Sequence, residues 1–135
     1  MDEGNAHIEV KKIADHWIQT SEDDAETMMI LYNSKSYGWS LFLGQISVEK
    51  LLKALYVKKF GKHAPFTHNL LKLAKLVNIE MSSEQLETID KITSFNLNAR
   101  YDDYKKEFYQ VCTQDFTQEW IDKITILRKW IKQQF

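Results

Sequence analysis

The sequence predicts an all-α fold: an up-and-down bundle of about five helices that forms one domain over residues 1–135. Three observations support this prediction. The chain contains one proline and four glycines, so few residues interrupt a helix. Residues 37–60 carry apolar side chains around nearly the whole circumference of a helix, which is typical of a helix surrounded by other helices. No segment shows the alternating pattern of a half-buried strand.

Composition indicates a globular protein. The chain has 135 residues, 44% of them hydrophobic and 27% charged, which suits one domain with a sizeable core. The single cysteine, Cys112, excludes an internal disulfide and fits a reducing compartment. No apolar run is long enough to span a membrane, and the first residues lack the order of a signal peptide. We therefore expect a cytoplasmic protein without membrane contact.

Two long helices are predicted in the first half. The first covers about residues 8–32, and polar residues 33–36 separate it from a central helix over residues 37–60. The apolar side of the first helix consists of Val10, Ile13, Trp17, Met28 and Tyr32. Gly61 is expected to end the central helix, because glycine is common just past a helix C-terminus. Lys58 and Lys59 favour the same end electrostatically.

Shorter helices are predicted in the second half. Pro65 marks a loop, and Thr67 is a candidate N-cap for a helix over residues 70–77. Ser82 or Ser83 begins a helix that continues through Ile92.

Residues 95–109 are rich in aromatic side chains and lack a clear periodicity. They are predicted to be an extended, partly ordered connection, and a long connection in a compact domain is often functional. The last helix covers about residues 116–131 and is capped by Thr113.

A polar stripe interrupts the apolar surface of the central helix. Gln45, Glu49 and Lys53 are spaced four residues apart and share one face, with Lys50 beside them. Buried polar groups need partners, so the stripe predicts either a small polar site between helices or a Glu49–Lys53 pair that satisfies itself at the rim of the bundle.

Charge is distributed unevenly although the net charge is −1. Residues 50–75 contain seven lysines and no acidic residue, whereas the first helix has four acidic residues within positions 22–26. The basic run is either a solvated face or a patch that attracts the phosphates of a nucleotide or RNA.

Two further segments contain candidate residues. His68 enters a helix just after its cap, where it either binds a ligand or contacts backbone and the central helix. Arg100 is one of two arginines, and its fork-shaped guanidinium suits phosphate or carboxylate. The alternative is an ion pair with Asp102, Asp103 or an acidic residue of the first helix.

Several chemistries have no counterpart in the sequence. The four glycines are isolated, so there is no glycine-rich phosphate loop, and one cysteine cannot supply the usual zinc spacings. No nucleophile elbow is present. We expect neither a metal nor a cofactor.

Three segments, in this order, resemble the HEPN family (higher eukaryote and prokaryote nucleotide-binding domain). Residues 45–55 (QISVEKLLKAL) resemble its core helix, residues 67–70 (THNL) its T-H-x-L element, and residues 99–102 (ARYD) its Arg-Tyr segment. A weaker likeness covers residues 14–32, where Asp24 stands at the usual acidic position.

The resemblance implies a helical bundle that is usually a homodimer and is similar to the C-terminal domain of kanamycin nucleotidyltransferases. Many members are encoded beside a minimal nucleotidyltransferase, as a two-component or toxin–antitoxin pair. Ribonuclease members have an arginine and a histidine that are separated by four to six intervening residues. After Arg100 these places are Lys105, Lys106 and Glu107, and no histidine follows His68. RNA cleavage would therefore lack its general acid or base.

We predict a non-catalytic HEPN protein that binds a nucleotide or phosphate-bearing ligand, forms a homodimer and acts with a minimal nucleotidyltransferase. One alternative is a degenerate or active ribonuclease toxin that acts on RNA through Arg100 and Tyr104. Another is a structural dimerisation module whose polar stripe fixes helix register.

The predicted ligand-binding residues are Gln45, Glu49, Lys53, Arg100 and Tyr101, with Asp24, Lys50, His68 and Tyr104 as secondary candidates. We expect Arg100 to fold back over the central helix, so that Glu49 lies between Lys53 and Arg100.

Overall fold

The computed structural model describes residues 3–135, with side chains from Glu9 onward. This part of the chain forms six helices: α1 (Glu3–Asn33), α2 (Tyr37–Phe60), α3 (Leu70–Val77), α4 (Ser83–Arg100), α5 (Asp102–Val111) and α6 (Gln114–Lys132). The all-α class is confirmed over residues 3–135, with six helices instead of about five. None of the helices in that range is long and apolar enough to cross a membrane.

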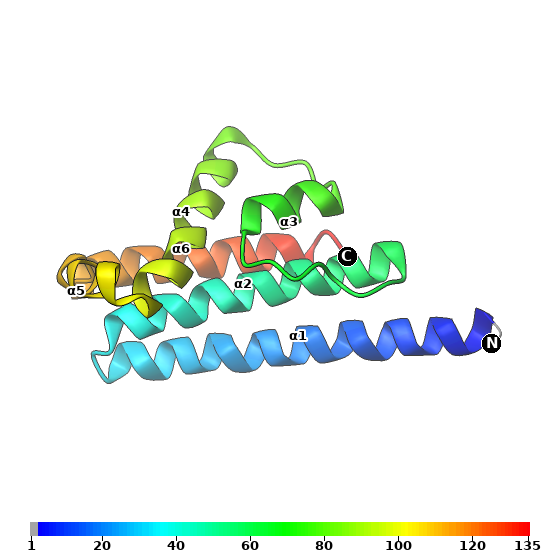
Figure 1. The fold of residues 1–135 in the computed structure, drawn as a ribbon, viewed down its shortest axis with the longest axis horizontal. Helices are drawn as coiled ribbons and strands as arrows, with labels where there is room; N and C mark the ends of the chain where they lie inside the picture. The colour runs from blue at the N-terminus through cyan, green and yellow to red at the C-terminus, as the bar shows by residue number, and fades with distance from the viewer. Residues whose placement is uncertain (1–2) are drawn as a thin grey trace.

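Helix α2 occupies the centre of the molecule. It contacts each of the other five helices, as its apolar circumference predicts. In Figure 1, α1 and α6 run alongside α2, whereas α3 and α4 lie on the side of α2 away from α1. The polar stripe of α2 therefore has neighbours on that side from later parts of the chain.

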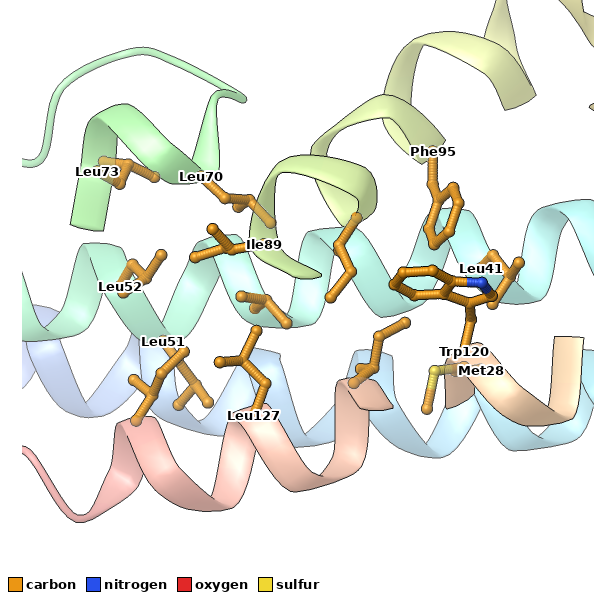
Figure 2. Close-up of a cluster of buried hydrophobic side chains, with 14 of the residues drawn as sticks. Met28, Leu41, Leu51, Leu52, Leu70, Leu73, Ile89, Phe95, Trp120 and Leu127 are labelled. Atoms are coloured by element: carbon orange, nitrogen blue, oxygen red, sulfur yellow. The ribbon is translucent and has the colours of Figure 1, made fainter. Parts of the chain in front are cut away.

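The hydrophobic core forms where the other helices meet α2. Figure 2 shows leucines of α2 and α3 packed with side chains of α1, α4 and α6. The ring of Phe95 stands edge-on to Trp120, with centroids 5.5 Å apart and an interplanar angle of 85°. Such edge-to-face contacts are favourable, and this one joins α4 to α6.

The helix ends agree with most of the predicted caps. Gly61 ends α2 with a φ of 66°, in the left-handed region that suits glycine. Ser82 forms a capping box with Gln85 at the start of α4, and Thr113 caps α6.

Asn69, and not Thr67, is the N-cap of α3, because its side chain accepts a hydrogen bond from the backbone N–H of Lys72. The prediction for Thr67 was therefore wrong. Its hydroxyl accepts a hydrogen bond from the N–H of Asn69 instead, which orders the segment that enters the helix.

The predicted extended connection over residues 95–109 was also wrong. Helix α4 continues to Arg100, and α5 begins at Asp102. Between them Tyr101 is extended (φ −89°, ψ 129°), so the chain changes direction without glycine or proline. Phe95 faces the core from α4 and Phe108 from α5. Because the aromatic residues belong to two helices with different directions, a single periodicity does not describe them.

Candidate functional site

The polar stripe of α2 lies in the interior. Gln45, Glu49 and Lys53 are 0%, 5% and 6% exposed. The alternative prediction placed a Glu49–Lys53 pair at the rim of the bundle. The pair exists, with Nζ of Lys53 3.1 Å from Oε2 of Glu49, but it is buried, so its predicted location was wrong. Polar groups at this depth need specific partners, and these come from residues 66–69 and from α4.

The second carboxylate oxygen of Glu49 contacts the segment before α3. Oε1 lies 2.8 Å from Nδ1 of His68 and accepts a longer hydrogen bond, 3.4 Å, from the side-chain amide of Gln45. The Gln45 amide also donates to the backbone carbonyl of His68 at 2.9 Å. These contacts tie the start of α3 to the middle of α2.

Asn96 of α4 is a site residue that the sequence did not reveal. It is 4% exposed, and its side-chain amide donates to Oε1 of Gln45 at 2.9 Å. The two residues are 51 positions apart, so no local spacing signals their contact. A polar residue in line with buried Ile89, Ile92 and Phe95 was the available clue.

Arg100 contacts Asn96 and not Glu49. Its Nη2 donates to Oδ1 of Asn96 at 2.6 Å, and its Nε donates to the Asn96 carbonyl at 3.1 Å. The expectation that Glu49 lies between Lys53 and Arg100 was wrong, since His68 occupies the second position beside Glu49.

Arg100 also does not form the ion pair with an acidic residue that was the alternative prediction. Its guanidinium lies 5.2 Å from the ring centroid of Tyr101, within cation–π range. Among the ion pairs of residues 9–135, none contains Arg100. The side chain is exposed, so it remains accessible to a ligand.

The residues Arg100, Asn96, Gln45, Glu49 and Lys53 thus form one polar chain across α4 and α2. Each link from Arg100 to Glu49 donates in the same direction, toward Glu49. A guanidinium only donates and an ionised carboxylate only accepts, so the two charged residues determine how both carboxamides are oriented. The middle of the polar chain is buried, and its Arg100 end is exposed.

Aromatic side chains flank the other end of the polar chain. Nζ of Lys53 lies 5.5 Å from the ring of Trp17 and 6.0 Å from the ring of Phe66. Phe66 is 98% exposed. The rim of the site at this end therefore presents an uncovered aromatic face beside His68, whose ring centroid lies 6.3 Å from that of Phe66.

Three secondary candidates lie apart from the polar chain. Asp24 and Lys50 form an ion pair of 2.6 Å that joins α1 to α2. Tyr104 is 47% exposed and borders a cavity of about 200 Å³ beside Glu107 on α5. A larger cavity of about 450 Å³, between the first turns of α4 and the C-terminal half of α6, contains none of the predicted site residues.

The basic run does not form a continuous cationic patch. Lys50 and Lys53 are in ion pairs, Lys59 donates to the carbonyl of Val77, and Lys58 lies over the ring of Phe135. The remaining lysines of the run are Lys62, Lys72 and Lys75, all exposed. Four of the seven lysines thus have partners within the protein.

A second buried cation ties the bundle together. Arg128 of α6 donates from Nη2 to Ser21 at 3.1 Å and to Glu22 at 3.2 Å. Lys132 also pairs with Glu22. Burial alone would raise the pKa of Glu22, but the hydrogen bonds and charges of Lys132 and Arg128 outweigh it and lower that pKa. This cluster joins α6 to α1.

Comparison with known proteins agrees with this architecture. The crystal structure of TT1696 from Thermus thermophilus matches with a TM-score of 0.79 and 16% sequence identity, covering 90% of this chain and 98% of that one. Identity at this level shows a shared fold. No protein with curated annotation matches the sequence. The family model of the HEPN domain matches residues 14–134, nearly the whole chain, and the chain belongs to the HEPN domain family.

Proposed function

We propose that this HEPN protein binds a nucleotide or another phosphate-bearing ligand at the exposed edge of the polar chain, without chemistry of its own. The observation that carries the proposal is the contrast between the buried, hydrogen-bonded residues from Asn96 to Lys53 and the accessible side chains that border them. A network that served packing alone has no need of an exposed guanidinium, a half-exposed imidazole and an uncovered aromatic ring next to it.

Each part of the edge suits one part of such a ligand. Arg100 offers a fork of donors for phosphate, and its Nη1 has no partner among the described residues. Phe66 offers a face on which a base can stack, a contact that contributes about 1–3 kcal/mol. The buried residues Gln45, Glu49 and Lys53 support this edge without facing the ligand, because they hold Asn96 and His68 in place.

The dimensions of the edge favour a ligand larger than a single anion. Gln45 and Lys53 are eight positions apart on α2, which is about 12 Å at 1.5 Å per residue. Arg100 joins the Gln45 end, and Phe66 lies at the Lys53 end. A nucleotide with its base at Phe66 and its phosphates toward Arg100 matches this layout.

Calorimetric titration with AMP, ATP and a dinucleotide tests the proposal. Arg100→Lys keeps the charge but removes the fork, so we expect binding to weaken by about tenfold or more. Lys129→Gln, which removes an exposed lysine of α6, is the matched control and should leave binding unchanged. Absence of binding below millimolar concentration in the wild type would contradict the proposal for these ligands.

The same proposal includes two protein partners, a second copy of this chain and a minimal nucleotidyltransferase. Exposed large apolar side chains on α1 and α6, among them Ile30 at 65% and Ile126 at 70%, support self-association. We expect a two-fold symmetric homodimer. Light scattering at micromolar concentration tests this, and a purely monomeric protein would contradict the homodimer.

A further inference from the structure

The imidazole of His68 lies between a buried carboxylate and the solvent. Its Nδ1 is 2.8 Å from Oε1 of Glu49, and the His68 side chain is 47% exposed against 6% for Glu49. The other oxygen of Glu49 pairs with Lys53 at 3.1 Å. Because an ionised carboxylate only accepts hydrogen bonds, the hydrogen in the His68–Glu49 contact belongs to Nδ1.

This contact decides what Nε2, on the far side of the ring, can bind. A neutral imidazole carries one hydrogen, so its other nitrogen is an acceptor. With the hydrogen on Nδ1, Nε2 of the neutral ring presents a lone pair, which suits a hydroxyl group and repels an anion. Only the imidazolium donates at Nε2 while keeping its bond to Glu49. No group among the described residues hydrogen-bonds to Nε2.

We propose that Nε2 of His68 is a donor for phosphate-type anions, and that each anion bound there brings one proton onto the ring. The inference rests on the proposed function, because it concerns the same edge of the polar chain. It adds a second anion-binding residue, beside Glu49 in the middle of the polar chain, and a coupling between binding and protonation. Arg100, which is always charged, binds without such coupling.

The charges around His68 agree with this assignment. Glu49 and Lys53 of α2 neutralise each other, and Arg100 of α4, which is positive, lies further along the polar chain, beyond Gln45 and Asn96. Lys72, in the first turn of α3, is exposed and positive. Helix α3 begins at Leu70, so its amino end adds partial positive charge close to residue 68. The contact from α1 is the neutral ring of Trp17 on Lys53. A protonated His68 therefore gives a local excess of positive charge that a bound dianion neutralises.

Proton uptake is measured directly by calorimetry with sulfate, which does not change its own protonation near neutral pH. Titrations at one pH in two buffers of different ionisation enthalpy give the number of protons taken up per anion. We expect close to one in the wild type, at a pH where nitrogen NMR shows the ring to be neutral before sulfate is added. His68→Gln keeps an uncharged donor, so we expect weaker binding, by about tenfold or more, and no uptake.

Two further variants separate the role of Glu49 from that of local charge. Glu49→Gln no longer requires a hydrogen on Nδ1, so the neutral ring can donate at Nε2 and uptake should fall well below one. His63→Gln changes an exposed histidine of the same basic loop and should leave both affinity and uptake unchanged.

Nitrogen NMR of the free protein provides a readout that needs no ligand. We expect neutral His68 to carry its hydrogen on Nδ1 in the wild type and to lose this preference in Glu49→Gln. A wild-type ring with the hydrogen on Nε2, or sulfate binding without proton uptake, would overturn this inference and leave the proposed function standing. Absence of binding for sulfate and for all nucleotides would overturn both.

Discussion

Glu49 of α2 and Arg100 of α4 carry opposite charges and are joined without touching, through the carboxamides of Gln45 and Asn96. Each carboxamide accepts a hydrogen bond at its oxygen from the Arg100 side and donates one from its nitrogen toward Glu49. Because Gln45 and Asn96 are 0% and 4% exposed, water cannot replace either of them. The arrangement satisfies buried polar groups and leaves the outer donors of Arg100 available to a ligand.

Substitutions of Gln45 and Asn96 are expected to have strongly non-additive effects on the free energy of unfolding. Gln45→Leu alone leaves the side-chain N–H groups of Asn96 without their acceptor, and Asn96→Leu alone leaves Oε1 of Gln45 without its donor. Each unmatched buried group costs roughly 1–3 kcal/mol. The double variant removes both polar groups, so its loss of unfolding free energy should be smaller than the sum of the two single losses. Urea denaturation of the four proteins measures this coupling.

The control for this cycle pairs Asn96→Leu with Gln118→Leu. Gln118 lies on α6 and hydrogen-bonds to Asp122 at 2.9 Å, outside the polar chain. These two changes should add within about 0.5 kcal/mol. Simple additivity for Gln45 and Asn96 as well would show that their hydrogen bond contributes little.

Core truncations on α2 are expected to be among the most costly single changes. Leu52 and Leu55 are 0% and 1% exposed, and each should lose about 2–5 kcal/mol of unfolding free energy when changed to Ala. Leu76→Ala on α3, where the side chain is 40% exposed, is the control and should cost much less. Thermal or urea unfolding followed by circular dichroism measures all three, and equal losses would contradict the burial pattern.

The central helix could be predicted from the sequence because its signals are local. Its apolar circumference, the break at residues 33–36 and Gly61 together specify the bounds Tyr37–Phe60 that the structure has. The turn between α4 and α5 could not be predicted in the same way. It depends on the extended conformation of Tyr101, a residue without a strong preference for ending helices, and on where Phe95 and Phe108 meet the core.

In the candidate site, too, the residues marked by local spacing could be predicted from the sequence, and those placed by tertiary contacts could not. The stripe Gln45, Glu49 and Lys53 lies on one helix, so a spacing of four residues reveals it. Asn96 enters only through the crossing of α4 over α2, a tertiary contact that no local pattern encodes. Arg100 was recognised by its chemistry, but its partner was misassigned, because charge suggests an ion pair where the structure has an amide.

Stability below pH 4.5 should depend on Glu22. Its pKa is lowered in the folded protein from the ordinary value of 4.5, so the folded state favours the carboxylate. The resulting stabilisation is present above that ordinary value and is lost as the pH falls through the lower folded pKa. Glu22→Gln should therefore be less stable than the wild type at neutral pH, and the difference should shrink in acid.

Urea unfolding at neutral pH and in steps below pH 4.5 tests this expectation. Glu26→Gln, an exposed acidic residue one turn further along α1, is the control and should not change the acid dependence. A constant difference between wild type and Glu22→Gln at all pH values would mean that the contacts of Glu22 with Arg128 and Lys132 do not lower its pKa.

Cys112 should react slowly with thiol reagents in the folded protein. It is 4% exposed, and burial raises the pKa of its thiol to about 12, so little thiolate is present at neutral pH. In a Cys112→Ser background, Val111→Cys places a thiol at the neighbouring position, which is 49% exposed, and should label much faster. Equal labelling rates would indicate that the end of α5 opens readily.

Purified protein should not cleave single-stranded RNA. No histidine follows His68, so the ribonuclease pattern after Arg100 lacks its general acid or base. Glu107→His is the change most expected to introduce cleavage, since Glu107 is exposed on α5 near Tyr104. Gel assays with wild type, Arg100→Ala and Glu107→His decide this. Wild-type cleavage that is lost in Arg100→Ala would instead support the toxin alternative.

The fixed direction of the polar chain also constrains how this protein can diverge. A leucine at position 45 leaves the side-chain N–H groups of Asn96 without their acceptor, and an acidic residue in place of Arg100 puts a carboxylate against Oδ1 of Asn96. Turning both carboxamides would then put Oε1 of Gln45 against Glu49, so no orientation suits both ends. Intermediates with one change carry the full penalty of an unmatched buried group. In related sequences, positions 45, 96 and 100 are therefore expected to be inherited as a set and to change together, so that substitution at one site predicts the residue at the others.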